Sequence, residues 1–282
     1  MLYLPACVPC IVKQAYTLSS KFAGCSEEIQ FKILGEVCSE IRNINSYSTS
    51  IKMSGIIQNV IEKYLGTENP YEKVKSTNIE IVKQYENYLH ELLQNSDDRL
   101  DMALRIAITG NSIDIAANPD FCIQNDIEQI TSDSIRLPLL EEFREKIKQG
   151  GIILYIGDNY EEAFFDRYLL SELLSKEIYF AVRSRPILND ITLTDAETLG
   201  IDKICKVIES GSTISGTDLE ECSSEFMEIF NKADIVIAKG QGNYESLFRA
   251  EREIYFLFKI KCSVVSVQTG YSMGNGVLIS NH

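Results

Sequence analysis

The chain has 282 residues, of which 45% are hydrophobic and 24% are charged, so it can bury a large core without disulfides or a structural metal. Its net charge of −14 argues against nucleic acid and anionic membrane surfaces as partners, because both require cationic patches. No apolar run approaches the roughly 20 residues of a membrane-spanning helix, and the N-terminus carries Pro5 and Pro9 and no basic leader, so we expect a cytoplasmic protein.

The first half of the chain has apolar residues at helical spacing and no convincing strand. Ser26 is a plausible N-cap for the first clear helix. A later helix contains Gly110-Asn111 in its middle, and the last one ends at Gly150-Gly151, which is typical of a C-cap and a domain boundary. The predicted helices are 26–43, 70–94, 98–118 and 137–149. We therefore predict an α-helical domain over residues 1–148.

The second half alternates short apolar runs with helical stretches, which indicates a parallel α/β sheet with helices on both faces. The predicted strands are 152–157, 177–182, 203–208, 234–239 and 262–267, with 276–280 as an edge candidate. We predict an α/β fold in which residues 149–282 form a Rossmann-like, doubly wound, mostly parallel sheet beside the all-helical N-terminal domain.

Polar residues follow four of these runs, at the sheet edge where ligands bind in open α/β folds. Asp158, Asn159 and Asp190 offer hard oxygen ligands suited to Mg²⁺ or Mn²⁺. Glycine-flanked strand ends that lead into helices can hold phosphate through N–H groups. The residues expected on the phosphate side are Ser212, Lys239, Gly240 and Asn243. The alternative for any one Asp or Asn is an ordinary helix cap.

Cys7 and Cys10 are the only close pair among eight cysteines, and the two histidines, His90 and His282, cannot complete a four-ligand zinc site. A C-x-x-C at the start of the first helix would place thiols where thiolate is favoured. Asn111 and Asp114 share one helical face at the Gly-Asn interruption. We expect these four residues to line the interface between the helical domain and the active edge of the sheet, where the helical domain closes one wall of the pocket and Asn111 and Asp114 face the substrate or a second metal. The alternative is an interdomain hydrogen-bond network with two buried thiols.

Several segments resemble the damage-control phosphatase family, formerly catalogued as domain of unknown function 89 and also called acidic-residue-methyltransferase-like. The resemblance is carried in the second half by GDNYEEAFFD (157–166) and by residues 182–200, 211–226 and 233–247. It continues in the helical half through Cys7-x-x-Cys10 and ITGNSIDIA (108–116). It thus covers nearly the whole chain, and the cysteine-containing N-terminus is similar to the prokaryotic branch.

The resemblance implies a metal-dependent phosphatase with a helical domain beside a Rossmann-like sheet. By motif, Asp158, Asn159 and Asp190 correspond to the catalytic metal ligands of the family, with Mn²⁺, Mg²⁺, Co²⁺ or Ni²⁺ as the ion. Lys261 corresponds to a lysine that contacts the substrate phosphate. The loop on the phosphate side corresponds to Lys239, Gly240 and Asn243.

Two positions depart from the family pattern. Glu161 stands where glycine more often follows GDN, which predicts a narrower pocket. Gln241 stands where the eukaryotic branch has aspartate, so the substrates of that branch are not assumed for this chain.

These observations predict an enzyme that hydrolyses a small phosphorylated metabolite, such as a sugar phosphate, a cofactor fragment or a nucleotide-related phosphomonoester, with the help of a divalent metal. One alternative is a non-catalytic, metal-dependent binder of such a metabolite. A third hypothesis makes Cys7 and Cys10 the working groups of a redox or metal-handling protein.

Overall fold

The computed structural model describes residues 4–22, 24–43, 50–66, 69–112 and 123–282. Its helices are α1 (Cys7–Thr17), α2 (Glu27–Arg42), α3 (Ser50–Leu65), α4 (Glu72–Lys83), α5 (Glu86–Gln94), α6 (Arg99–Gly110), α7 (Ile123–Glu128), α8 (Leu140–Gln149), α9 (Tyr160–Glu172), α10 (Leu193–Thr198), α11 (Ser224–Lys232), α12 (Gly240–Leu247) and α13 (Ser263–Thr269). Its strands are β1 (Ile135–Arg136), β2 (Ile152–Ile156), β3 (Glu177–Val182), β4 (Lys206–Glu209), β5 (Ile235–Lys239), β6 (Tyr255–Lys259) and β7 (Gly276–Ser280).

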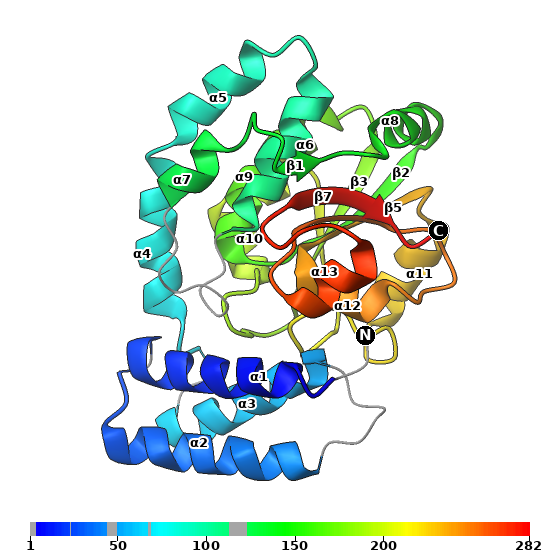
Figure 1. Ribbon diagram of the computed structural model, residues 1–282. Coiled ribbons are helices and arrows are strands. Elements are labelled where there is room, and N and C mark those ends of the chain that lie inside the picture. The colour runs from blue at the N-terminus through cyan, green and yellow to red at the C-terminus, as the bar shows by residue number, and fades with distance from the viewer. Residues whose placement is uncertain (1–3, 23, 44–49, 67–68, 113–122) are drawn as a thin grey trace.

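The described strands form one sheet in the order β1-β7-β6-β5-β2-β3-β4. Every neighbouring pair is parallel except β6 and β7, which are antiparallel. The chain runs from β2 outward through β3 to β4 and then returns to the other side of β2 with β5, so the strand order reverses between β2 and β5 (Figure 1). The predicted doubly wound, mostly parallel α/β fold is therefore confirmed. Such a reversal opens a crevice at the carboxyl ends of the two strands.

Both faces of the sheet are buried. Ile153 and Tyr155 of β2 belong to one hydrophobic cluster, and Leu154 and Ile156 belong to another, because successive residues of a strand point to opposite faces. Helices α4, α5, α6, α8 and α9 contribute to the first cluster, and α11, α12 and α13 contribute to the second. This two-sided cover explains why the central strands are apolar throughout.

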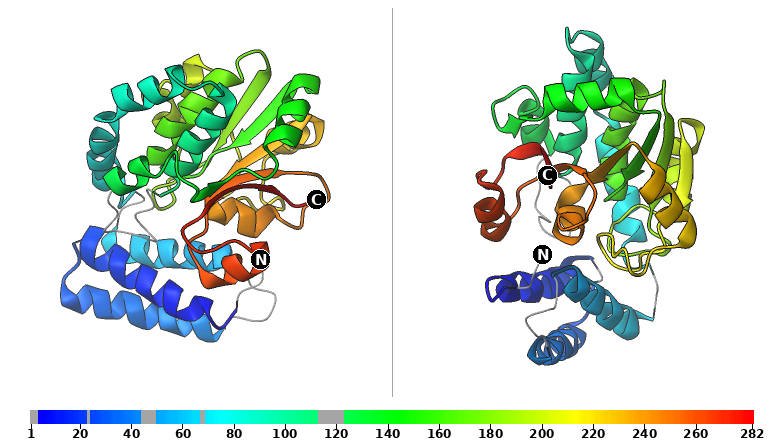
Figure 2. Two further views of the ribbon diagram at one scale, coloured as in Figure 1. Left: turned by 45° about the horizontal axis from the view of Figure 1, so that its top comes forward. Right: turned by 90° about the vertical axis from the view of Figure 1, so that its right-hand side faces the viewer.

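Helices α1, α2 and α3 form a separate block with its own cluster, which also takes in Ile187 and Leu188 from the segment between β3 and α10. Figures 1 and 2 show this block apart from the sheet, next to α12 and α13. Helices α4–α8, by contrast, contribute to the cluster on one face of the sheet, where α6 packs on β6 and β7, α4 packs on α9 and α5 packs on α6. The predicted domain boundary at 148/149 is therefore not where the packing divides the chain, since the division falls between α3 and α4. Helical spacing shows that a face is buried but does not show against what it packs.

The apolar run 262–267 is the main error in the strand prediction. It forms helix α13, and the strand at this point of the sheet is β6 instead. Cys262 caps α13, with its sulfur accepting a hydrogen bond from the Val265 N–H, and Val267 is 85% exposed. The run is therefore apolar without being buried throughout, and only burial would have distinguished it from a core strand.

The helix predicted over 98–118 is α6, and it ends at Gly110. A Cβ on Gly110 would lie 2.9 Å from the side chain of Phe165, so this glycine allows α6 to pack closely on α9. The helix predicted over 26–43 is α2, capped by the Ser26 hydroxyl, which accepts a hydrogen bond from the Ile29 N–H at 3.4 Å. This prediction and its cap are confirmed.

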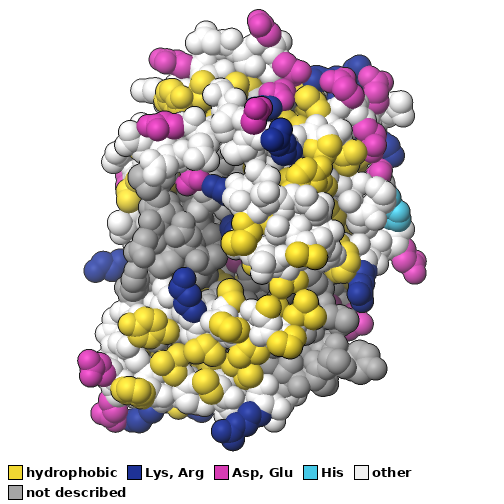
Figure 3. Space-filling view, in the orientation of Figure 1, with side chains coloured by type: hydrophobic (Ala, Val, Ile, Leu, Met, Phe, Trp, Pro, Cys, Tyr) yellow, Lys and Arg dark blue, Asp and Glu magenta, His cyan; other side chains and the backbone are white. Residues whose placement is uncertain are grey.

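The block of α1–α3 exposes large apolar side chains to solvent. Tyr16 of α1 is 52% exposed and Phe31 of α2 is 77% exposed. Figure 3 shows hydrophobic side chains gathered on this block, below the sheet in that view. Across the part of the chain that the structure describes, no helix has the length and apolar content needed to cross a bilayer.

Candidate active site

Two strand ends meet at the reversal of strand order. Strand β2 is followed by Gly157, Asp158 and Asn159, and β5 runs directly into Gly240, the first residue of α12. Gly240 has a left-handed φ of 80°, and a Cβ built on it would lie 1.7 Å from Oδ2 of Asp158. Only glycine therefore lets the backbone between β5 and α12 approach the Asp158 carboxyl group this closely.

Asp158 and Asn159 belong to a buried network of amides and carboxylates. The Asn111 amide donates to Oδ2 of Asp158 at 3.3 Å and to Oε1 of Glu162 at 2.5 Å. The Asn159 amide donates to the same Glu162 oxygen at 2.7 Å. The Oδ1 of Asn111 accepts from the backbone N–H of Lys259 at 2.8 Å. The interruption at Gly110-Asn111 is thus the end of a helix that places an amide behind Asp158, rather than in the pocket itself.

Asp190 is brought to the same place by the segment after β3. The backbone of Asp190 pairs with that of Asn159 in an isolated β-bridge, and the N–H of the neighbouring Ile191 donates to the Asp158 carbonyl at 2.8 Å. The Asp190 side chain is 1% exposed and accepts from the Arg183 guanidinium at 2.7 Å and from the Ser215 hydroxyl at 3.2 Å. The three residues predicted as metal ligands therefore lie together at one strand edge.

Crowded charge makes this edge suited to a cation. Burial raises the pKa of Asp158 well above its usual range, and the carboxylates of Glu162 and Asp190 raise it further, while Lys261 and Arg183 act in the opposite direction. A hard divalent ion bound by oxygen atoms would keep Asp158 ionised. Among the residues that the structure describes, no three His, Cys, Asp or Glu side chains lie close enough together to hold a metal ion by themselves. An ion here would therefore need the Asn159 amide oxygen, water or substrate oxygens besides the aspartates.

Lys239 lies beneath the site and not in the position predicted from the sequence. Its side chain is fully buried, and its ammonium group donates to the Ala107 carbonyl at 2.9 Å, Asp166 at 2.7 Å and Glu162 at 3.3 Å. Burial lowers the pKa of Lys239, but Asp166 and Glu162 outweigh this effect and raise it overall. The prediction of a phosphate contact is therefore corrected: this ammonium group neutralises two buried carboxylates.

Asn243 and Ser212 also act on the backbone instead of facing a ligand. The Asn243 amide donates to the Gly157 carbonyl at 3.1 Å and to the Lys239 carbonyl at 2.7 Å, so it ties the ends of β2 and β5 together. The Ser212 hydroxyl donates to the Gly216 carbonyl at 3.2 Å within its own loop. Both side chains are fully buried and neither lines the pocket, so the structure does not support their prediction as direct substrate contacts.

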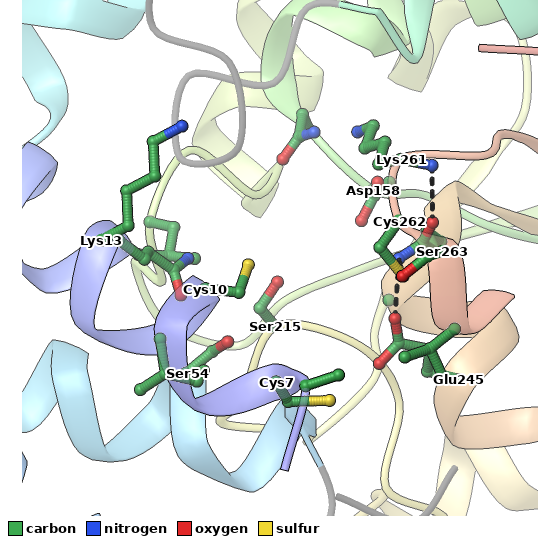
Figure 4. Close-up of a pocket in the computed structure, with 18 of the residues that line it drawn as sticks. Cys7, Cys10, Lys13, Ser54, Asp158, Ser215, Glu245, Lys261, Cys262 and Ser263 are labelled. Atoms are coloured by element: carbon green, nitrogen blue, oxygen red, sulfur yellow. Dashed lines mark hydrogen bonds between the residues drawn. The ribbon is translucent and has the colours of Figure 1, made fainter. Parts of the chain in front are cut away.

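A pocket of about 340 Å³ opens over Asp158 and Asn159. One wall is the sheet edge with Gln241, Lys261 and Cys262, and the facing wall is α1 (Figure 4). Lys261 lines the same pocket and is close enough to Asp158 to lower its pKa, and its predicted contact with the substrate phosphate stays a prediction. The backbone N–H of Lys261 donates to the Gln241 side chain at 2.9 Å. The volume suits a small metabolite.

The α1 wall carries Cys7 and Cys10, as predicted for the pocket wall. The expectation of thiolates there is wrong. Burial raises the pKa of both thiols, and the nearby carboxylate of Glu245 raises it further, so both stay protonated at neutral pH despite the helix N-terminus. Asp114, predicted beside Asn111, lies outside the described residues.

Comparisons with known proteins identify the family of this chain. Residues 3–277 match the family described as the damage-control phosphatase ARMT1-like domain. The chain belongs to this family. It is 34% identical to an uncharacterized protein of Methanocaldococcus jannaschii, covering 98% of this chain and 94% of that one. It is 35% identical to a damage-control phosphatase of Pyrococcus horikoshii over 78% of this chain and 77% of that one. A crystal structure of a DUF89 family protein from Pyrococcus horikoshii superposes with a TM-score of 0.88 at 30% identity, covering 100% of both chains.

This damage-control phosphatase family member also differs from its sequence-based prediction at Glu161. That side chain is fully buried, accepts hydrogen bonds from Asn78 and Asn189 at 3.2 Å each, and does not line the pocket, so it does not narrow it directly. Burial raises the pKa of Glu161 to about 7. The sequence analysis missed two residues of the site. Glu162 accepts hydrogen bonds from the Asn111 and Asn159 amides, and Arg183 donates a hydrogen bond to Asp190. The available signals were a carboxylate three residues after Asn159 and an arginine directly after β3.

Proposed function

We propose that this chain is a divalent-metal-dependent phosphatase that hydrolyses a small phosphomonoester. The observation that carries the proposal is the meeting of Asp158 and Asn159 with Gly240 at the reversal of the sheet, under a pocket that also contains Lys261. The relatives from Pyrococcus horikoshii and Archaeoglobus fulgidus, the latter 28% identical over 97% of each chain, are named damage-control phosphatases. This naming supports a phosphatase that acts on a damaged metabolite.

Asp158, Asn159 and Asp190 are the residues that would hold the ion, with Mn²⁺, Mg²⁺, Co²⁺ or Ni²⁺ as candidates. The fit rests on the buried, crowded carboxyl groups: burial raises the pKa of Asp158, the carboxylates of Glu162 and Asp190 raise it further, and a divalent charge would favour the ionised form. A bound divalent cation supplies Lewis acidity for a phosphoryl oxygen and for a water molecule. Asn111 and Glu162 orient the ligand side chains from behind through the hydrogen bonds described above.

The remaining groups of the pocket suit the phosphate and the rest of the substrate. Lys261 provides a positive charge next to Asp158, and the first turn of α12 points backbone N–H groups toward the strand edge, where they favour an anion. The α1 wall covers the opposite side of the pocket. A sugar phosphate, a cofactor fragment or a nucleotide-related phosphomonoester would fit a pocket of about 340 Å³.

The test is release of inorganic phosphate from a panel of phosphomonoesters, with and without Mn²⁺. We expect turnover only with the metal. In Lys261→Ala we expect kcat/KM to fall on the order of tenfold or more, because the positive charge next to the transferred phosphate is removed. Lys206→Ala is the matched control, since Lys206 is an exposed lysine of β4 paired with Glu177. Metal-dependent binding of an ester without turnover would favour the non-catalytic binder instead. Equal activity of both lysine variants would remove Lys261 from the phosphate site.

A further inference from the structure

Three of the cysteines that the structure describes line the one pocket that contains Asp158. Cys7 and Cys10 lie in the first turn of α1, and Cys262 caps α13 on the facing wall. All of them are free thiols. The proposed phosphatase chemistry gives none of these sulfur atoms a role.

Cys7 and Cys10 are placed to react with each other. Residues three apart on a helix have Cβ atoms about 5–6 Å apart. A disulfide needs a Cβ separation of about 3.5–4.5 Å and accepts Cα separations of about 4.4–6.8 Å. Closure therefore requires an adjustment of about 1–2 Å within the first turn. The N-cap residue Ala6 makes no side-chain cap and Pro9 has no N–H bond to lose. The adjustment would loosen the hydrogen bonds from the Cys7 N–H to the Leu4 carbonyl and from the Val8 N–H to the Pro5 carbonyl.

Cys262 is the less suitable partner. Its sulfur accepts a hydrogen bond from the Val265 N–H at 3.5 Å and another from the Gln241 amide at 3.6 Å, both within its own wall. The pocket lies between this wall and α1 (Figure 4). A bond from Cys262 to either thiol of α1 would therefore break these contacts and close the pocket. A bond between Cys7 and Cys10 requires neither of these changes.

We propose that Cys7 and Cys10 form a reversible dithiol–disulfide site on the α1 wall of the pocket. The oxidant is a low-molecular-weight disulfide such as glutathione disulfide. One cysteine thiolate attacks it, forms a mixed disulfide and releases one glutathione; the second cysteine displaces the other glutathione. Two protein thiols are oxidised to one disulfide, one glutathione disulfide is reduced to two glutathione molecules, and the two protons pass to the released thiolates.

Formation of the disulfide draws the sulfur of Cys10 toward Cys7, so the shape of the α1 wall depends on the thiol redox state. The raised pKa of both thiols slows the first attack at neutral pH, because the thiolate is the nucleophile. The exchange is therefore expected to accelerate as the pH rises from 7 to 9, by up to about tenfold per pH unit.

The test is incubation of the full-length protein in a glutathione–glutathione disulfide buffer at pH 8, followed by intact and peptide mass spectrometry. Wild type is expected to lose two hydrogens from a single tryptic peptide that ends at Lys13 and contains both cysteines. Cys262→Ser should lose the same two hydrogens, whereas Cys10→Ser should lose none and carry glutathione on Cys7. Dithiothreitol should restore wild type.

Two results would overturn the proposal. One is a disulfide that links Cys262 to either α1 cysteine, and the other is separate glutathione adducts on Cys7 and Cys10 in wild type. Cys38→Ser serves as the control for an exposed thiol outside the pocket. The readout does not use phosphate release, so a failure of the redox site and a failure of the phosphatase proposal are distinguishable.

Discussion

Replacing Gly240 by alanine tests whether the close approach of two strand ends forms the site. The new Cβ would lie 1.7 Å from Oδ2 and 2.2 Å from Cγ of Asp158, whereas ordinary contacts begin at 3.4 Å. Either the carboxyl group or the backbone between β5 and α12 must therefore move by more than 1 Å. The left-handed φ of 80° adds a backbone cost of about 1–2 kcal/mol for alanine.

The expected loss in kcat/KM is on the order of 100-fold, because a displacement of about 1 Å at reacting groups costs about that much. Gly270→Ala is the matched control: Gly270 has a φ of 78° and no atom within 4 Å of its added Cβ, so it carries the backbone cost without the clash. Both variants should lose a few degrees in Tm, and only Gly240→Ala should lose activity.

The assay is Mn²⁺-dependent phosphate release at a temperature where circular dichroism shows both variants folded. Wild-type kcat/KM in Gly240→Ala would refute the argument, since the methyl group would then fit beside Asp158 without disturbing it. An equal loss of activity in Gly270→Ala would also refute it, because backbone strain at a distance would then explain the effect.

Three further results are expected. Lys239→Met should lower the free energy of unfolding by about 3–5 kcal/mol in urea titrations, because two buried carboxylates lose their cation; a stable variant would contradict its structural role. Burial raises the pKa of Asp166 from 3.8 to about 6, so the folded chain holds a proton that the unfolded chain releases, and this contribution to stability is lost as the pH rises through 6. Unfolding measured from pH 4 to 7 should therefore show a flatter decline in Asp166→Asn than in wild type, and identical slopes would count against it. Asn111→Ala should raise the Mn²⁺ concentration for half-maximal activity by about 10–100-fold, because the amide behind Asp158 is lost; an unchanged metal titration would exclude that positioning role.

The parts of the fold that local pattern determines could be predicted from the sequence. The strands at 177–182 and 276–280 have the predicted bounds, because each is a short apolar run between turn residues. Asp158, Asn159 and Asp190 meet because the carboxyl ends of parallel strands share one edge, which follows from topology alone.

The features that depend on distant partners could not be predicted. Lys239 follows a buried strand as a phosphate-binding lysine would, but Asp166 and Glu162 of α9, more than 70 residues earlier in the chain, draw its ammonium group away from the pocket. The runs 255–259 and 262–267 are both apolar and rich in strand formers, and only the exposure of Val267 marks the second as a surface helix. The thiols of α1 lie at a helix N-terminus, but burial in the pocket outweighs the helix dipole.

The most direct test of the central claim is Mn²⁺ binding measured by electron paramagnetic resonance on wild type and on Asp158→Ala. We expect one tightly bound Mn²⁺ per wild-type chain, lost in Asp158→Ala together with phosphate release, while circular dichroism shows that the variant remains folded. Mn²⁺ binding of equal affinity and stoichiometry in Asp158→Ala would contradict the assignment of the metal to the carboxyl edge of β2.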